Sequence, residues 1–118
     1  MKLGHTTSIL RIFDEAKARE FYVDFLKFRV DWEHRFGDDF PLYLQISRGD
    51  CVLHLSEHYG DATPGSTVRV ETEGIEELCG ELQGYRYYKP HLEEADWGRE
   101  MKLLDPFGNR LIFSERKK

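Results

Sequence analysis

The sequence has few or none of the features that identify disulfide-rich, secreted or membrane-spanning proteins. It contains two cysteines, Cys51 and Cys79, each in an apolar segment, so we expect reduced core residues and no disulfide framework. No apolar run approaches membrane-spanning length, and the N-terminal stretch lacks the sustained apolar segment of a signal peptide. We therefore expect a soluble, cytoplasmic protein.

An excess of positive charge is also missing. The chain has 17 Lys and Arg against 22 Asp and Glu, which gives a net charge of -5. With no basic stripe to neutralise phosphates, the sequence argues against a nucleic-acid partner. The acidity is compatible with a cationic small molecule. At 118 residues, 40% of them hydrophobic, the chain is long enough for one domain with its own core.

Common catalytic patterns are absent as well. There is no glycine-rich phosphate loop, and neither cysteine lies at a predicted helix N-terminus. The adjacent carboxylates Asp38-Asp39 and Glu93-Glu94 fall in segments that we expect to be loops, where a solvated charge run is the simplest explanation.

What the sequence does contain is an internal duplication. Residues 96–115 predict a β-hairpin with strands at 99–104 and 110–115. In the turn between them, Asp105 can cap, Pro106 presets φ and Gly108 can adopt a positive φ. A weaker copy spans residues 44–57 and also crosses a glycine-containing turn. When the two copies are aligned, His54 is equivalent to Ile112 and Leu55 is equivalent to Phe113.

The flanking segments repeat the same order of elements. Asp14 is expected to cap the first helix, and Gly84 is expected to end the second. A polar connection at 57–65 separates the two halves. The first half predicts strands at 6–13, 28–35, 42–47 and 51–56 around a helix at 15–27. The second predicts a strand at 67–72, a helix that starts after residue 72 or 73, a strand at 85–89, a loop at 90–97 and the hairpin. Both halves therefore read β-α-β-β-β, an α+β arrangement.

These motifs resemble the glyoxalase and bleomycin-resistance superfamily, the vicinal oxygen chelate fold. The resemblance rests on Asp14 with the run Ala18-Arg19-Glu20-Phe21-Tyr22, on Val52-Leu53-His54-Leu55 and on Asp105-Pro106-Phe107-Gly108-Asn109-Arg110-Leu111. Trp97-Gly98-Arg99-Glu100 is similar to the bleomycin-resistance branch. Lys27 departs from the pattern, because that position is usually glycine. The resemblance implies one domain over residues 1–118, with module one at about 1–57 and module two at about 66–116. The two βαβββ modules would form a cup-shaped mixed sheet.

In the enzymes of this superfamily, about four His and Glu side chains hold a divalent metal inside the cup. The matching positions here are Thr7, His54, Thr67 and Ile112, and only His54 is a credible ligand. His5, two residues before Thr7, could join it in a weak site of two ligands. We therefore expect no catalytic residue, no metal and no cofactor, and we expect His54 to be a hydrogen-bonded residue that lines the cup.

The remaining signal is aromatic. In the resistance proteins of this superfamily, aromatic side chains line a crevice at the dimer interface. This crevice sequesters a large, cationic, flat-ringed glycopeptide without changing it chemically. Aromatic faces stack on planar rings and attract cations, and an acidic rim adds long-range attraction. The alternative is that Trp32 and Tyr43 are core residues. The expected ligand-binding residues are Trp97, Trp32, Phe36, Phe40, Tyr43, His54, Tyr59 and Arg99, and the expected acidic rim is Asp38, Asp39, Glu93, Glu94 and Asp96.

The resemblance also implies a homodimer, in which the strand at 6–13 can be exchanged between the two chains. We accordingly expect a non-enzymatic protein that confers antibiotic resistance by sequestering a bleomycin-type antibiotic, with no nucleic-acid or membrane partner. Two alternatives stay open. One is a metal-dependent lyase, isomerase or dioxygenase of the glyoxalase type, and the other is a binder of another amphipathic small molecule.

Overall fold

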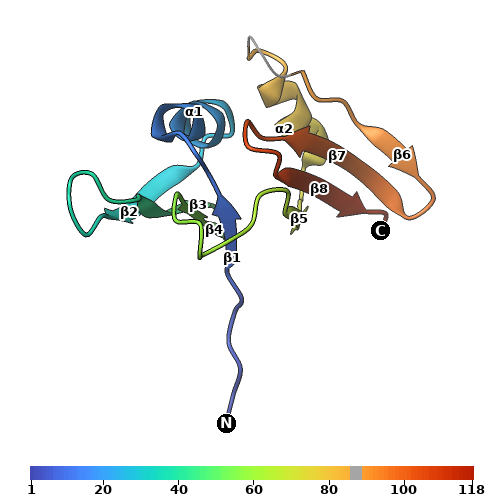
Figure 1. The fold of residues 1–118 in the computed structure, drawn as a ribbon. Coiled ribbons are helices and arrows are strands. Elements are labelled where there is room, and N and C mark those ends of the chain that lie inside the picture. The colour runs from blue at the N-terminus through green and yellow to red at the C-terminus, as the bar shows by residue number, and fades with distance from the viewer. Residues whose placement is uncertain (86–88) are drawn as a thin grey trace. The chain divides into compact units, whose positions relative to one another are not determined.

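The computed structural model describes residues 1–85 and 89–118, which form two compact units, Met1–Pro64 and Gly65–Lys118. Each unit contains a four-stranded mixed sheet, and its helical segment lies over one face of that sheet (Figure 1). The order of elements is β-α-β-β-β in both units. The predicted α+β duplication is confirmed. No helix of the described part of the chain is long and apolar enough to cross a membrane.

The first unit follows the predicted order closely. Its elements are β1 (Ser8–Arg11), α1 (Glu15–Arg19), the π-helix η1 (Glu20–Phe25), β2 (Arg29–His34), β3 (Tyr43–Arg48) and β4 (Cys51–Ser56). The strand order is β1-β4-β3-β2, with β1 parallel to β4 and the other pairs antiparallel. In this single chain β1 pairs with β4 of its own module, and exchange of the N-terminal strand stays a prediction.

The first helical segment is capped as the sequence predicts, but it is shorter. The carboxylate of Asp14 accepts a hydrogen bond from the backbone N–H of Lys17 at 2.9 Å. The helix widens into the π-helical turn and ends at Phe25 rather than at Lys27. Lys27 has φ of 60°, and no other non-glycine residue in the described part of the chain has a positive φ. The left-handed conformation explains why this position favours glycine.

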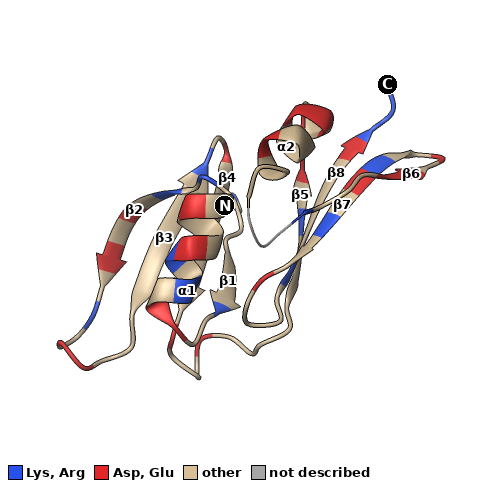
Figure 2. Cartoon of the chain, turned by 90° about the horizontal axis from the view of Figure 1, so that it is seen from above, with Lys and Arg blue, Asp and Glu red and all other residues tan. Residues whose placement is uncertain are grey.

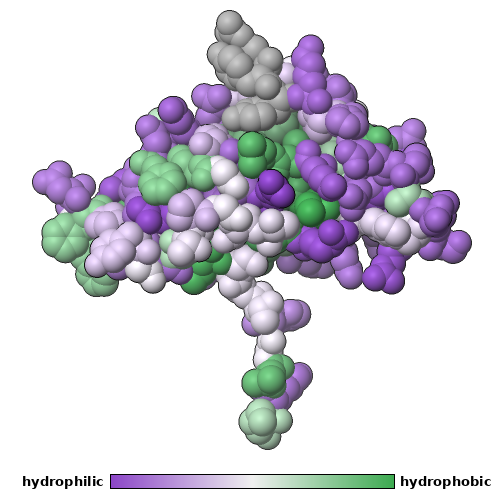
Figure 3. Space-filling view, turned by 45° about the vertical axis from the view of Figure 1, so that its right-hand side comes forward, coloured by the Kyte–Doolittle hydropathy of each residue, from purple (hydrophilic) through white to green (hydrophobic). Residues whose placement is uncertain are grey.

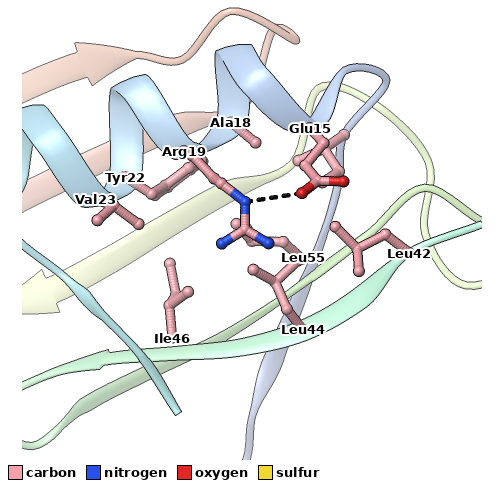
Figure 4. Close-up of a pocket in the computed structure, with 10 residues that line it drawn as sticks. Glu15, Ala18, Arg19, Tyr22, Val23, Leu42, Leu44, Ile46 and Leu55 are labelled. Atoms are coloured by element: carbon pink, nitrogen blue, oxygen red, sulfur yellow. Dashed lines mark hydrogen bonds and ion pairs between the residues drawn. The ribbon is translucent and has the colours of Figure 1, made fainter. Parts of the chain in front are cut away.

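The core of the first unit lies between this helical segment and one face of the sheet. Leu10 and Ile12 on and after β1 are completely buried, which confirms the predicted alternation. The side chains of α1 and of β3 and β4 meet with no space for a water molecule between them, and the Glu15–Arg19 ion pair lies at the edge of this packing (Figure 4). This face of the sheet is therefore filled by its own helix and offers no room for a ligand.

The second unit repeats the topology. Its elements are β5 (Thr67–Glu71), α2 (Ile75–Leu82), β6 (Glu93–Ala95), β7 (Gly98–Leu104) and β8 (Arg110–Arg116). The strand order is β5-β8-β7-β6, with β5 parallel to β8. The predicted strand at 85–89 includes residues 86–88, which lie outside the described residues. The prediction of a loop at 90–97 was wrong for β6, because Glu-Glu-Ala has little β-propensity of its own and is strand through its pairing with β7.

Helix α2 is capped from another strand rather than by its own sequence. Gly74, its N-cap, has φ of 78° and no side chain, and neither Thr72 nor Glu73 takes that position. Instead the carboxylate of Glu115 on β8 accepts hydrogen bonds from the N–H groups of Gly74 and Ile75 at 3.0 and 3.3 Å. Helix α2 ends at Leu82 with Gln83 as its C-cap, so Gly84 lies directly after the cap, the position at which the sequence predicts glycine to end the helix.

The turn between β7 and β8 has the predicted geometry. Oδ1 of Asp105 accepts hydrogen bonds from the N–H groups of Phe107 and Asn109, each at 2.8 Å. Gly108 has φ of 91°, the positive φ that the turn requires. Asp105 and Asn109 are both buried. The function of this motif is therefore structural.

Candidate ligand-binding face

The sheet of the first unit has a second face, opposite α1, and three of the predicted site residues meet on it. The rings of Trp32 and Tyr43 are parallel to within 8°, with centroids 5.9 Å apart. The ring of His54 meets both of them edge-on, at 5.3 Å from Trp32 and 5.2 Å from Tyr43. We call Trp32, Tyr43 and His54 the aromatic face. Because Trp32 is 44% exposed, this cluster is open to solvent and is not part of the core.

A β-bulge places Trp32 on this face. Arg29 pairs with Ser47, and strict alternation from there would turn Trp32 toward the helix. The pairing of β2 with β3 shifts between Val30 and Trp32, so that Trp32 pairs with Gln45 instead. The extra residue of the bulge, Asp31, also directs its carboxylate to this face. Bulges of this kind re-aim side chains, and here the bulge turns the ring of Trp32 onto the face that carries the carboxylate of Asp31.

A series of hydrogen bonds links Tyr43 and His54 of the aromatic face to Gln45 and Asp31. The phenol oxygen of Tyr43 lies 2.6 Å from Nδ1 of His54, and Nε2 of His54 lies 3.0 Å from Oε1 of Gln45. The amide nitrogen of Gln45 donates to Oδ2 of Asp31 at 3.1 Å. Because an amide oxygen can only accept, Nε2 of His54 carries the proton, and Nδ1 accepts from Tyr43. We refer to Tyr43–His54–Gln45–Asp31 as the hydrogen-bonded chain.

The charge states of the hydrogen-bonded chain follow from its surroundings. The amide of Gln45, the hydroxyl of Ser47 and the guanidinium of Arg29 all donate to Asp31 and lower its pKa. Burial lowers the pKa of His54, so the imidazole is neutral at pH 7. Burial also raises the pKa of Tyr43, with a smaller contribution from the charge of Asp61. The hydrogen-bonded chain thus runs from the neutral phenol of Tyr43 to the ionised carboxylate of Asp31.

The donors on this face do not fit a metal ion. Both ring nitrogens of His54 are engaged in hydrogen bonds, while Thr7 precedes β1 and Thr67 begins β5. Ile112 lies in β8 and offers no donor atom. His5 is exposed in the segment before β1. Across residues 1–85 and 89–118, no three His, Cys, Asp or Glu side chains come together as a ligand set.

The other predicted aromatic residues of this unit lie on loops. Phe36 is 84% exposed and its ring meets that of His34 edge-on at 4.7 Å. Phe40 is half exposed, and its carbonyl accepts a hydrogen bond from Arg35 at 3.1 Å. Tyr59 is largely exposed and stacks on the ring of His58. Their part in ligand binding stays a prediction. The space-filling view shows hydrophobic side chains projecting among polar ones (Figure 3).

The two predicted site residues of the second unit have different surroundings. Trp97 is 42% exposed in the two-residue turn between β6 and β7, and its carbonyl accepts from the N–H of Lys117. Arg99 pairs at 3.5 Å with Glu115 and at 3.5 Å with Glu76 on α2, a helix whose charged residues are all acidic (Figure 2). These two carboxylates occupy the guanidinium of Arg99, and its contact with a ligand stays a prediction.

Three functional candidates were missed by the sequence analysis: Asp31, Gln45 and Ser47. The polar alternation of residues 43, 45 and 47 along β3 was a usable signal for Gln45 and Ser47, because alternate residues of a strand share a face. Asp31 lies two residues after Arg29, which pairs with Ser47, so the same alternation was a usable signal for it. The placement of Trp32 on this face depends on the bulge, which only the pairing of β2 with β3 reveals.

The fold and this face define a class of protein built from two βαβββ modules, with an open aromatic face in place of a metal ligand set. A family profile described as "Glyoxalase superfamily protein" matches residues 1–118. The chain belongs to that superfamily. No curated protein sequence matches it.

Solved structures of antibiotic-binding proteins are similar to this chain. TnmS3, an antibiotic binding protein from Streptomyces sp. CB03234, has a TM-score of 0.77 at 23% identity, with 99% of each chain covered. A bleomycin-binding protein from bleomycin-producing Streptomyces verticillus, complexed with copper(II)-bleomycin, has a TM-score of 0.69 at 26% identity, with 99% of each chain covered. A bleomycin resistance determinant encoded on the transposon Tn5 has a TM-score of 0.72 at 18% identity, covering 98% of this chain and all of that one.

Proposed function

We propose that this protein is a non-enzymatic binding protein that sequesters a bleomycin-type glycopeptide antibiotic in the cytoplasm and so confers resistance. The observation that carries the proposal is the aromatic face. It presents the parallel rings of Trp32 and Tyr43 beside an ionised carboxylate, on the side of the sheet that no helix of its unit covers. Planar heteroaromatic rings stack on such faces, and cations are attracted to them.

The similar structures support the same function. Those named above are described as binding an antibiotic or bleomycin, or as a bleomycin resistance determinant. None of these descriptions names a catalysed reaction. The aromatic face supports ligand binding rather than metal-assisted chemistry, since both ring nitrogens of His54 are hydrogen-bonded, one to Tyr43 and the other to Gln45.

We further propose that the binding crevice forms at the interface of a homodimer. Each sheet of the chain has two edge strands, and in the first sheet these are β1 and β2. An unpaired strand edge favours association with another chain. In such a dimer the exposed rings of Phe36, Phe40, Tyr59 and Trp97 would join the aromatic face, and the strand at 6–13 could be exchanged. Sedimentation at micromolar protein tests this, and a monomeric mass would contradict it.

Isothermal titration with metal-free and copper-loaded bleomycin tests the proposed function. We expect saturable binding by the wild-type protein and about 1–3 kcal/mol weaker binding by Trp32→Ala, the usual cost of removing an aromatic anchor. Leu104→Ala is the matched control, because Leu104 is an exposed apolar residue on β7. Expression of the protein should protect cells from bleomycin. Absence of both heat and protection would refute the proposal.

A further inference from the structure

The connection between β2 and β3 carries two exposed rings on a short piece of chain. Its middle, residues 36–41, contains Phe36, which is 84% exposed, and Phe40, which is 54% exposed. We call residues 36–41 the aromatic loop. Rings that are so exposed contribute little packing energy, and a loop of this kind samples several conformations unless other bonds restrict it. Here the restricting bonds involve the two flanking residues, Arg35 and Leu42.

The guanidinium of Arg35 contacts three separate parts of its unit. Nη2 donates to Oε1 of Glu15, at the start of α1. Nη1 donates to the carbonyl oxygen of Phe40 at 3.1 Å and lies 3.8 Å from Oε1 of Glu57, the residue after β4. The side chain of Arg35 is 31% exposed, so these contacts are partly shielded from water. An arginine reaches separate acceptors at once, because its nitrogens point in different fixed directions.

Glu57 brings the two ends of the connection together. Its Oε1 accepts a hydrogen bond from the N–H of Leu42 at 2.9 Å, and its own N–H donates to the carbonyl of Leu42 at 2.9 Å. Leu42 is 1% exposed and so anchors the far end of the loop in the core. The same carboxylate oxygen of Glu57 therefore faces Arg35 before the aromatic loop and Leu42 after it.

Phe40 is held from inside the loop as well. Its N–H donates to the carbonyl of Gly37 at 3.0 Å, while its own carbonyl accepts from Arg35. The ring of Phe40 lies against Gly37, where a Cβ would be 3.4 Å from Cδ1 of the ring. The backbone that carries this ring is thus bonded on both sides, and one of the two bonds comes from Arg35.

We infer that Arg35 is a positioning residue for ligand binding, which holds the aromatic loop in one conformation before the ligand arrives. The inference rests on the proposed function, because it takes the rings of Phe36 and Phe40 as ligand-binding groups. Ordering a loop or a side chain on binding weakens the affinity, and a loop that is already ordered avoids this cost. Arg35 acts through the loop, since its terminal nitrogens are engaged by Glu15, Phe40 and Glu57.

Amide hydrogen exchange of the free protein tests the effect on the loop. In Arg35→Gln, the N–H groups of Phe40 and Leu42 should exchange about three- to tenfold faster than in the wild type, the factor that one net hydrogen bond supplies. Arg19→Gln is the matched control, because Arg19 pairs with the same Glu15 from within α1, and it should leave both rates unchanged. Wild-type rates in Arg35→Gln, or an equal acceleration in both variants, would overturn the inference.

Titration with metal-free bleomycin tests the effect on binding. Arg35→Gln should bind about two- to tenfold more weakly than the wild type, the factor for ordering one side chain on binding. In a protein that already carries Phe36→Ala and Phe40→Ala, the same substitution should have no further effect, because the rings through which Arg35 acts are gone. An equal loss in both backgrounds would overturn the inference, since Arg35 would then act on binding by another route.

The outcomes separate this inference from the proposed function. No bleomycin binding by the wild-type protein, together with faster loop exchange in Arg35→Gln, refutes the proposed function alone and leaves Arg35 as the residue that orders the loop. Bleomycin binding that Arg35→Gln does not weaken refutes the inference alone.

Discussion

His54 and Ile112 occupy the same register position in the two modules. His54 on β4 pairs with Ile9 on the parallel strand β1, and Ile112 on β8 pairs with Arg69 on the parallel strand β5. The structure thus confirms the alignment of the two halves that the sequence predicted. One module places a hydrogen-bonded imidazole at this position, and the other places an aliphatic side chain that cannot bind a metal.

We expect the protein to gain no stability from Ni²⁺ or Zn²⁺ at this position, because both nitrogens of His54 are already engaged in hydrogen bonds. Thermal melts with chelator and with added metal test this. Ile9→His combined with Gln45→Ala is the positive control, since it places a second imidazole beside His54 on the neighbouring strand and releases Nε2 of His54 from its hydrogen bond. A ligand that binds only the folded state raises the melting temperature. A metal-dependent rise for the wild type that His54→Ala removes would contradict the prediction.

We expect Lys27→Gly to stabilise the protein by about 0.5–1 kcal/mol. A side chain in the left-handed region costs about 1–2 kcal/mol, part of which the greater freedom of an unfolded glycine offsets. Lys17→Gly is the matched control, because Lys17 lies within helix α1 and glycine there should destabilise by about 1 kcal/mol. Urea unfolding measures both variants. The two substitutions should change the free energy of unfolding in opposite directions, and a loss of stability in Lys27→Gly would contradict the prediction.

The sequence predicted those parts of the fold whose causes are local. Elements with a strong local pattern were predicted well, such as the alternation around Leu10 and the turn at Asp105, because their causes lie within a few residues. The fold class followed from their repetition. Elements that depend on distant partners were not predicted. Strand β6 forms because it pairs with β7, and α2 begins where the carboxylate of Glu115 accepts a hydrogen bond from the N–H of Gly74.

The same distinction applies to the candidate site. Trp32, Tyr43 and His54 were predicted as site residues, and the structure brings them together. Their connection through Gln45 to Asp31 was not predicted, because hydrogen bonds between side chains of neighbouring strands depend on the register of β2 against β3. No local sequence signal shows the bulge that turns Trp32 onto this face.

We expect Glu115→Gln to destabilise the protein at pH 7 and to weaken the dependence of its free energy of unfolding on pH in the acid range. Hydrogen bonds from the N–H groups of Gly74 and Ile75 lower the pKa of Glu115 from its ordinary value of 4.5. A carboxylate with a lowered folded-state pKa stabilises above its unfolded pKa, and this stabilisation is lost as the pH falls through the folded pKa. The variant and the wild type should therefore converge at low pH.

Urea unfolding at pH 7 and below pH 4 measures this difference, with Glu73→Gln as the control. Glu73 is an exposed carboxylate close to the same helix start and does not cap it. A constant difference between Glu115→Gln and the wild type across this pH range would show that the capping charge is not responsible.

We expect Gly98→Ala to destabilise the protein by about 1–3 kcal/mol through overpacking. A Cβ at Gly98 would lie 2.2 Å from the carbonyl oxygen of Glu115 and 2.9 Å from Cα of Arg116, both backbone atoms that cannot move aside. Gly80→Ala is the control, because nothing lies within 4 Å of a Cβ there, and alanine in helix α2 should stabilise by about 0.5–1 kcal/mol. Thermal or urea unfolding that ranks the two variants in the opposite order would contradict this explanation of the Trp-Gly-Arg motif.

The role of Trp97 can be separated from that of its neighbour Gly98. Trp97 lies in a two-residue turn with 42% of its surface exposed, so Trp97→Ala should leave the melting temperature nearly unchanged. If its ring is a wall of the binding crevice, the same variant should bind bleomycin about 1–3 kcal/mol more weakly, as expected for an aromatic anchor. Calorimetric titration and a thermal melt of one preparation measure both quantities. A large loss of stability with unaltered affinity would assign the ring to the packing of its own module, because its remaining contacts would then be structural.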